Sequence, residues 1–305
     1  MAKKYLDPKA DLTFKKVFGE HPDLVTSLLN ALLPFKKGEE IESVEYLSPE
    51  LVPENPLRKF SIVDVRCRDN RGRQFLVEMQ MVWSREFKQR VMFNSAKAYV
   101  RQLDSKEEYH LIEPVYSLNI VNDIFEKDIS DYYHYYRMVH EKHTDKVIDG
   151  LHLVFVELPK FTPQTISEKK MQVLWLRYLT EIEERTKEVP QELLDNPEIS
   201  KALTVVEESA YTEAQMLAYD KFWDIIRTER TFYNSAHRDG FKEGRDAGLE
   251  AGLEEGRKEG IKEGIKEGLE KEKIETIKRL KSNGFDIATI AIATGMSEED
   301  IMRFL

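Results

Sequence analysis

In FSIVDVRCRDNRGRQFLVEMQM, residues 60–81, two runs of mostly apolar residues flank a short polar segment. Apolar side chains at every second position are typical of strands, and residues 60–67 and 74–81 both show this spacing. Residues 68–73 between them are polar and include a glycine, which suits a hairpin turn. We therefore predict two neighbouring antiparallel strands.

Further elements are predicted on both sides of this hairpin. Helical spacing of apolar residues runs over residues 11–33, with Asp11 placed as the N-cap and Pro34 directly after the end. The other predicted elements are a helix over residues 84–103 and strands over residues 41–47, 114–122 and 151–158. The order α-β-β-β-α-β, with one added strand, predicts a mixed α/β core over residues 1–165.

The rest of the chain reads as helical. Segments such as MQVLWLRYL and EAQMLAYDKFWDIIRTERTFY have helical spacing, and strand patterns fade. We predict three successive parts: a helical extension over residues 166–236, a glycine-repeat segment over residues 237–272, and a small module that resembles a helix-turn-helix over residues 273–305.

In the glycine-repeat segment, eight glycines recur at every fourth position from Gly240 to Gly268. A step of four residues advances about 40° past one helical turn, so the glycines spiral around a helix instead of holding one face. Each also costs roughly 1 kcal/mol of helix stability relative to alanine. Two interpretations stay open: a flexible helical linker, or a helix that self-associates because small residues let backbones approach closely.

The closing module is predicted as two short helices on either side of the sequence TGMS, with Ser297 as the N-cap of the second. Two roles stay open for it. One role is to enter a DNA groove, although few basic residues are present to contact phosphate. The other is structural, with Ile290 and Ile292 buried against the preceding helix.

Charge and composition narrow the function classes. A net charge of -10 argues against a protein that coats nucleic acid non-specifically. Residues 54–101 depart from that average, with eleven Lys or Arg against five Asp or Glu, either around an active site or on a solvated face. The single cysteine, Cys67, allows no internal disulfide. No run of eighteen apolar residues and no apolar leader occur, so we expect a cytoplasmic protein with no membrane partner.

Asp64, Glu78 and Gln80 carry the candidate chemistry. Carboxylates inside apolar strands need compensation, and the hairpin brings Asp64 beside Glu78 and Gln80, which share one face of their strand. Two converging carboxylates suit a hard cation such as Mg²⁺, with water, a backbone carbonyl and a phosphate oxygen as further ligands. The alternative is purely structural: the two acids pair with Arg66, Arg73 or Arg90 across the sheet.

The motifs DLTFKKVFG, DVRC, VEMQ and KQRVMFNSAKAYVRQL together resemble the PD-(D/E)XK nuclease family transposases, also described as recombination-promoting nucleases of the Rpn group. The resemblance covers roughly residues 1–160 and implies a restriction-endonuclease-like fold. It implies that Asp64 and Glu78 are metal ligands, and it places Gln80 where the superfamily usually has lysine. A glutamine supplies no charge there, but it can hold water by hydrogen bonds.

The same resemblance implies roles for three further residues. Arg90 matches an arginine that can contact phosphate, and Tyr99 matches a tyrosine on the same helix; an ion pair and core packing are the alternatives. Asp11 matches a position where related nucleases place another acidic metal ligand, and helix capping is its alternative.

These observations predict a DNA endonuclease that hydrolyses phosphodiester bonds with Mg²⁺, for which Mn²⁺ can substitute, in DNA recombination or mobile-element biology. The alternative is a catalytically weak DNA-binding or assembly protein built on a nuclease fold. No nucleotide cofactor is expected, because the sequence has no P-loop and no G-x-G-x-x-G motif. His134, His140 and His143 are expected to be ordinary surface histidines.

Overall fold

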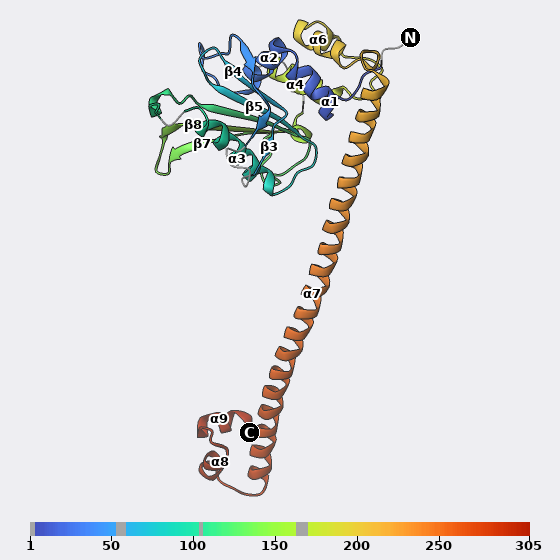
Figure 1. Ribbon diagram of the computed structural model, residues 1–305. Helices are drawn as coiled ribbons and strands as arrows, with labels where there is room; N and C mark the ends of the chain where they lie inside the picture. Colours follow the sequence, from blue (N-terminus) through green and yellow to red (C-terminus); the bar gives the residue numbers. More distant parts are fainter. Residues whose placement is uncertain (1–3, 53–58, 104–105, 163–169) are drawn as a thin grey trace. The chain divides into compact units, whose positions relative to one another are not determined.

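The computed structural model describes residues 4–52, 59–103, 106–162 and 170–305 and divides into two units, Met1–Thr231 and Phe232–Leu305 (Figure 1). The first unit holds a six-stranded sheet in the order β1-β4-β5-β6-β8-β7. The bounds are β1 (Val44–Tyr46), β4 (Val65–Asp69), β5 (Gln74–Gln80), β6 (Val115–Val121), β7 (Tyr133–His140) and β8 (His143–Glu157). β5, β6 and β8 run parallel and the other pairs antiparallel, which confirms the predicted mixed α/β fold.

Helices pack on both faces of this sheet. The bounds are α1 (Asp11–Gly19), α2 (Pro22–Leu32), α3 (Glu86–Val100), α4 (Lys170–Glu181), α5 (Gln191–Leu194) and α6 (Pro197–Val205), with 3₁₀ turns at Tyr109–Leu111, Leu158–Lys160 and Glu208–Ala210. The main core joins α1, α2, α4 and α6 to alternate strand residues such as Val77. Residues on the opposite face, such as Leu76 and Phe155, pack against α3. The even-numbered positions of β5, Glu78 and Gln80 included, therefore face α3.

The hairpin of β4 and β5 confirms the prediction made from residues 60–81. Its turn contains Gly72 at φ +87°, a left-handed conformation that favours glycine. Asp69 Oδ1 accepts the backbone N–H groups of Arg71 and Arg73 at 3.0 and 2.9 Å, and its carboxylate also pairs with the Arg73 guanidinium. The turn is thus held by local polar contacts.

The single strand predicted over residues 60–67 is wrong. Ser61–Ile62 forms β3, which pairs with β2 (Glu50–Leu51) in a separate two-stranded sheet, and β4 begins only at Val65. The break lies at Asp64. The N–H of Met79 donates to Asp64 Oδ2 at 2.8 Å, so a side-chain carboxylate stands where a continuous ladder would place a backbone carbonyl.

The single helix predicted over residues 11–33 is also wrong, because α1 ends at Gly19 and α2 begins at Pro22. Proline has no N–H for the helix interior but is tolerated in the first turn, so it starts a new helix. Asp11 does not cap α1. The N-cap is Ala10, with no side-chain cap bond, and Asp11 is the first helical residue.

The segment around β7 departs from the sequence expectations. β7 was not predicted, and β8 starts at His143 instead of residue 151. Tyr133 and Tyr135 of this edge strand pack on the main core, and Tyr133 Oη donates to Leu32 O at 2.9 Å. His134 is not a surface residue: it is 8% exposed, and Nε2 lies 2.8 Å from Glu157 Oε2. His140 and His143 are exposed, as expected.

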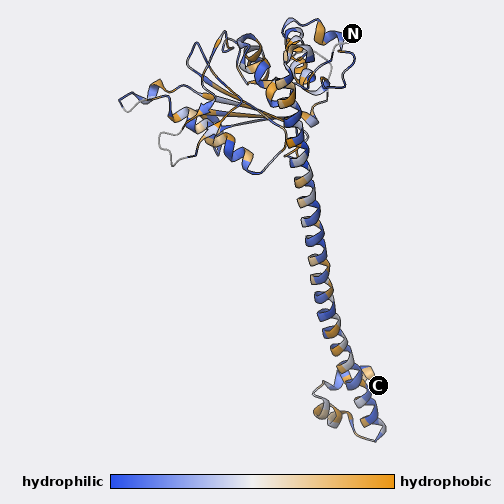
Figure 2. Ribbon diagram, turned by 45° about the vertical axis from the view of Figure 1, so that its right-hand side comes forward, coloured by the Kyte–Doolittle hydropathy of each residue, from blue (hydrophilic) through white to orange (hydrophobic). Residues whose placement is uncertain are grey.

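One continuous helix, α7 (Glu213–Ser282), contains the last segment of the first unit and the glycine repeat. Its first turns belong to the first unit, where Tyr219 is buried against Leu6 and Ala10. In the glycine repeat, a Cβ added at any of the eight glycines would meet no atom of the described residues within 4 Å. Figure 2 shows that hydrophilic residues predominate along α7, with apolar residues scattered among them.

The second unit ends in two short helices, α8 (Ile287–Thr294) and α9 (Glu298–Phe304). The Ser297 side chain accepts the Asp300 N–H, which confirms the predicted cap. Ile277, Ile290 and Ile301 are fully buried together, whereas Ile292 is 86% exposed. In the described part of the chain, no helix has the length and hydropathy that a membrane span requires.

Candidate active site

A cavity of about 740 Å³ lies between the end of β5 and α3; we call it the β5 cavity. Asp64 lies directly before β4, β5 contributes Glu78 and Gln80, and α3 contributes Arg90 and Asn94. Four of the residues singled out in the sequence therefore line one cavity.

Strand register brings the two carboxylates together. Val65 pairs with Val77, so Asp64, one residue before Val65, lies beside Glu78, one residue after Val77. Gln80 follows on the same face of β5. The hairpin that the sequence predicts is thus sufficient to assemble this part of the site.

The surroundings of Asp64 stabilise its negative charge poorly. Its side chain is 23% exposed. Burial raises the pKa of its carboxyl group, and the Asp11 carboxylate raises it further, while the Met79 N–H and the Lys15 ammonium lower it in part. The ionised form is therefore left with more negative charge than its neighbours compensate.

Glu78 is still more deeply buried, at 7% exposure. Asn94 Nδ2 donates to Oε1 at 3.1 Å, and Arg90 Nη2 donates to Oε2 at 3.3 Å. These contacts lower the pKa, but burial and the charge of Asp64 outweigh them and raise the pKa of Glu78 to about 7. Carboxyl groups with such raised pKa values gather at functional sites.

Gln80 and Arg90 are joined directly. Arg90 Nη2 donates to Gln80 Oε1 at 2.5 Å, and Gln80 Nε2 donates to Val82 O at the same distance. The structural alternative was that Asp64 and Glu78 pair with Arg66, Arg73 or Arg90. Of these arginines, Arg90 pairs with Glu78, whereas Arg66 donates to Gln74 and Arg73 pairs with Asp69.

Lys15 is a member of the site that sequence reasoning missed. Its Nζ lies 2.6 Å from Asp11 Oδ1 and 3.7 Å from Asp64 Oδ1, so one ammonium joins the two acids. Asp11 is 49% exposed and faces the site through this lysine. The spacing of Asp11 and Lys15, four residues on one helix, is a local signal for their pairing; the approach to Asp64 depends on tertiary packing.

Asn94 was also missed, although it lies one helical turn after Arg90 and so shares its face of α3. It is 1% exposed, and its buried Oδ1 has no hydrogen-bond partner among the residues that the structure describes. A buried, unsatisfied acceptor is costly and marks a place where a further donor would be stabilised.

Tyr99 lies elsewhere. It follows Arg90 by nine residues, about half a turn out of phase on an α-helix. Its ring is next to Gly150, where an added Cβ would meet Tyr99 Cε2 at 3.3 Å, and it packs with Leu76 and Ala98. It is not among the side chains that line the β5 cavity. A DNA contact by Tyr99 stays a prediction.

The donor set suits a divalent cation in its chemistry. Carboxylate oxygens are the ligands that Mg²⁺ prefers, and a cation would relieve the burial of charge that raises both pKa values. Across the described residues, no group of three or more His, Cys, Asp or Glu is placed to hold a metal ion. Asp64 and Glu78 would therefore need water or substrate oxygens to complete the ligands, as Mg²⁺ sites commonly do.

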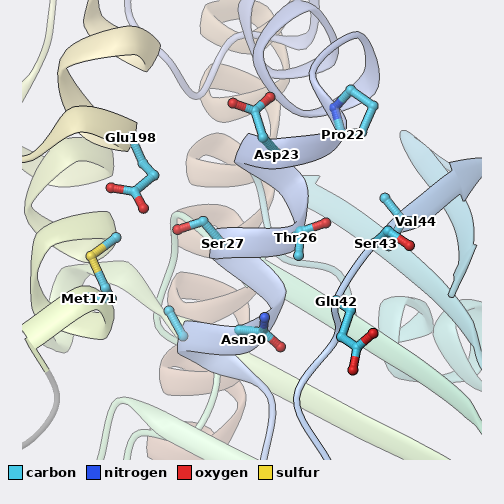
Figure 3. A pocket seen from close by; sticks show the side chains of 11 residues that line it. Pro22, Asp23, Thr26, Ser27, Asn30, Glu42, Ser43, Val44, Met171 and Glu198 are labelled. Carbon is cyan, nitrogen blue, oxygen red and sulfur yellow. The ribbon is translucent and has the colours of Figure 1, made fainter. Parts of the chain in front are cut away.

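A second cavity of about 630 Å³ differs in chemistry (Figure 3). Residues of α2, including Asp23, Ser27 and Asn30, line one side, and the carboxylates of Glu42 and Glu198 also line it. This acidic lining does not suit a phosphate backbone. The β5 cavity, by contrast, is lined by Lys59 and Arg90 as well as by its carboxylates.

A mixed sheet with helices on both faces, and two acidic side chains at one cavity beside the β4–β5 hairpin, is consistent with a PD-(D/E)XK nuclease-like fold. The family model described as PD-(D/E)XK nuclease family transposase matches residues 8–229, and the chain belongs to this family. Membership implies nuclease activity in general, and such nucleases usually use divalent metals. No curated protein and no solved structure matches the chain.

Proposed function

We propose that this protein is a Mg²⁺-dependent DNA endonuclease that hydrolyses phosphodiester bonds in the β5 cavity. The observation that supports this most strongly is the convergence of Asp64 and Glu78, two poorly compensated carboxylates, one directly before β4 and one on β5, with Arg90 beside them. The family supports a nuclease; the metal, the DNA substrate and a role in recombination or mobile-element biology are our proposal.

Asp64 and Glu78 would hold Mg²⁺, or Mn²⁺ in its place, with Asp11 as a further candidate ligand. When bound, the ion supplies a Lewis acid that lowers the pKa of water and offsets charge on the phosphate. Asn94 orients Glu78 through its 3.1 Å hydrogen bond. The backbone N–H of Met79 does the same for Asp64.

Three other side chains would act on water and phosphate. Gln80 orients the attacking water by hydrogen bonding. Arg90 is 46% exposed and contacts Glu78 and Gln80 through one of its nitrogens, so its guanidinium can also bind a phosphate oxygen. Lys15 supplies a positive charge beside Asp64, where Gln80 supplies none.

The alternative is a DNA-binding or assembly protein with a weakened catalytic site. Cleavage of duplex DNA and binding of the same DNA in EDTA separate the two. We expect Asp64→Ala to lose cleavage while it binds DNA in EDTA as tightly as wild type. DNA binding that needs no metal, together with no cleavage by wild type in Mg²⁺ or Mn²⁺, would favour the alternative.

A further inference from the structure

Three exposed apolar side chains line the β5 cavity beside the acidic residues. The exposed fractions are 45% for Phe60, 54% for Ile62 and 43% for Phe93. Large apolar groups gain nothing from a phosphate backbone, and leaving them in water is unfavourable. Because they line the same cavity as Asp64 and Glu78, we expect an apolar part of the substrate to cover them.

Lys97 contacts the segments that carry these three side chains, which we call the apolar wall. Its Nζ donates to Leu51 O at 2.6 Å and to Lys59 O at 2.7 Å, and it lies 5.2 Å from the centre of the Phe93 ring. One lysine thus ties the segment that carries Phe60 to helix α3, which carries Phe93. The wall is a built feature of the cavity.

Nucleobases are the apolar part of DNA, and in an intact duplex they are stacked on one another and paired. Unpaired bases stack on exposed aromatic rings, while neighbouring cations bind the backbone. Lys59 and Arg90 line the same cavity as the wall, so the charge for the backbone and the rings for the bases occur together.

We propose that Phe60, Ile62 and Phe93 form a base-stacking wall, and that the preferred substrate is DNA with unpaired bases beside the scissile phosphate. This inference rests on the proposed nuclease function and adds the substrate class. It assigns the wall to substrate selection, whereas Asp64 and Glu78 act on the phosphate.

The test measures binding of the full-length protein to two oligonucleotides in EDTA, by fluorescence anisotropy. One is an intact duplex, and the other has the same sequence with a central unpaired segment that carries 2-aminopurine. We expect wild type to bind the unpaired DNA more tightly and to quench the 2-aminopurine. Phe60→Ala and Phe93→Ala should each weaken that binding roughly tenfold and leave duplex binding unchanged.

Two sets of variants complete the design. Met92→Ala and Val100→Ala remove exposed apolar groups of the same helix that do not line the cavity, and both should bind like wild type. Phe60→Leu and Phe93→Leu keep apolar bulk but lack the ring, so they should show the same selective loss. They provide the test if the alanine variants fold poorly.

The result separates this inference from the nuclease proposal. A selective loss of unpaired-DNA binding supports the wall even if no DNA is cut. Equal losses for both oligonucleotides, or no loss in any ring variant, would overturn the wall even if wild type cuts DNA.

Discussion

At the residue scale, Glu78 combines deep burial with a neighbouring carboxylate, and its pKa of about 7 in the metal-free protein follows from both. The ordinary value is 4.5. Between these two pH values, the folded protein keeps the proton that the unfolded chain has lost. The stability that this proton provides is complete below about pH 4.5 and is lost as the pH rises through 7.

Glu78→Gln, which cannot ionise, removes this dependence. Between pH 4.5 and 8 in EDTA, the difference in free energy of unfolding between wild type and variant should shift by roughly 3 kcal/mol in favour of the variant. Urea unfolding at each pH measures it. Parallel curves for the two proteins would mean that Glu78 ionises normally.

Lys15 is expected to contribute to cleavage through its charge beside Asp64. Lys15→Gln should lower the cleavage rate at saturating metal roughly tenfold, because it removes a positive charge next to the reacting groups. It should also lower the metal concentration needed for half-maximal rate, since the ammonium and the metal compete for Asp64. Lys37→Gln, a change at an exposed lysine, is the control. An unchanged metal dependence would restrict Lys15 to a structural role.

The sequence predicted that Asp64, Glu78 and Gln80 lie close together, because the hairpin and the alternation of side chains along a strand follow from local rules. Arg90 and Asn94 share a face of α3 for an equally local reason, but only the packing of α3 on β5 shows that this face meets the site. Lys15 reaches Asp64 through the docking of α1, which no spacing encodes. These contacts needed the structure.

At the element scale, the turn of the β4–β5 hairpin controls the register on which the site depends. Gly72→Ala should destabilise the protein by about 1–2 kcal/mol, since alanine disfavours φ +87° and its Cβ would lie 3.2 Å from Glu113 Cγ. Gly19→Ala is the matched control, because its Cβ makes an ordinary 3.8 Å contact with Val65. Urea unfolding that places both variants level with wild type would contradict this role of the turn.

The wrongly predicted elements show where local sequence patterns were not enough to predict the structure. Pro22 carried a helix-start signal that the continuous apolar spacing of residues 11–33 obscured. The break at Asp64 depends on a hydrogen bond from Met79, fifteen residues away. β7 is an edge strand whose hydrogen-bonded neighbour is β8. Its residues 136–140 are all exposed, Met138 and Val139 included, so its burial does not alternate in the way that predicts a strand.

At the scale of the whole molecule, the family match ends at residue 229, close to the end of the first unit at Thr231. The glycine repeat lies outside the match. We propose that it mediates self-association, since its glycines are open to close approach and exposed apolar residues such as Leu253, Ile261 and Ile265 accompany them.

Replacement of the eight glycines by alanine tests this proposal. The added methyl groups meet no described atom within 4 Å and should strengthen the helix, yet they would block close backbone contact between copies. We expect the mass measured by light scattering to fall, as it should in a chain that ends at Asp239. That shorter chain should keep its metal binding. A mass unchanged in both would exclude assembly through this segment.

Nicking of supercoiled plasmid across a titration of Mg²⁺ and Mn²⁺ tests whether Asp64 and Glu78 hold the metal of a nuclease, with wild type, Asp64→Asn and Glu78→Gln prepared identically. Wild type should cut only when metal is present, and each variant should be slower by roughly a thousandfold, because it lacks one of the two carboxylates that hold the ion. Equal cutting by all three proteins would contradict the account and place the activity at a different site.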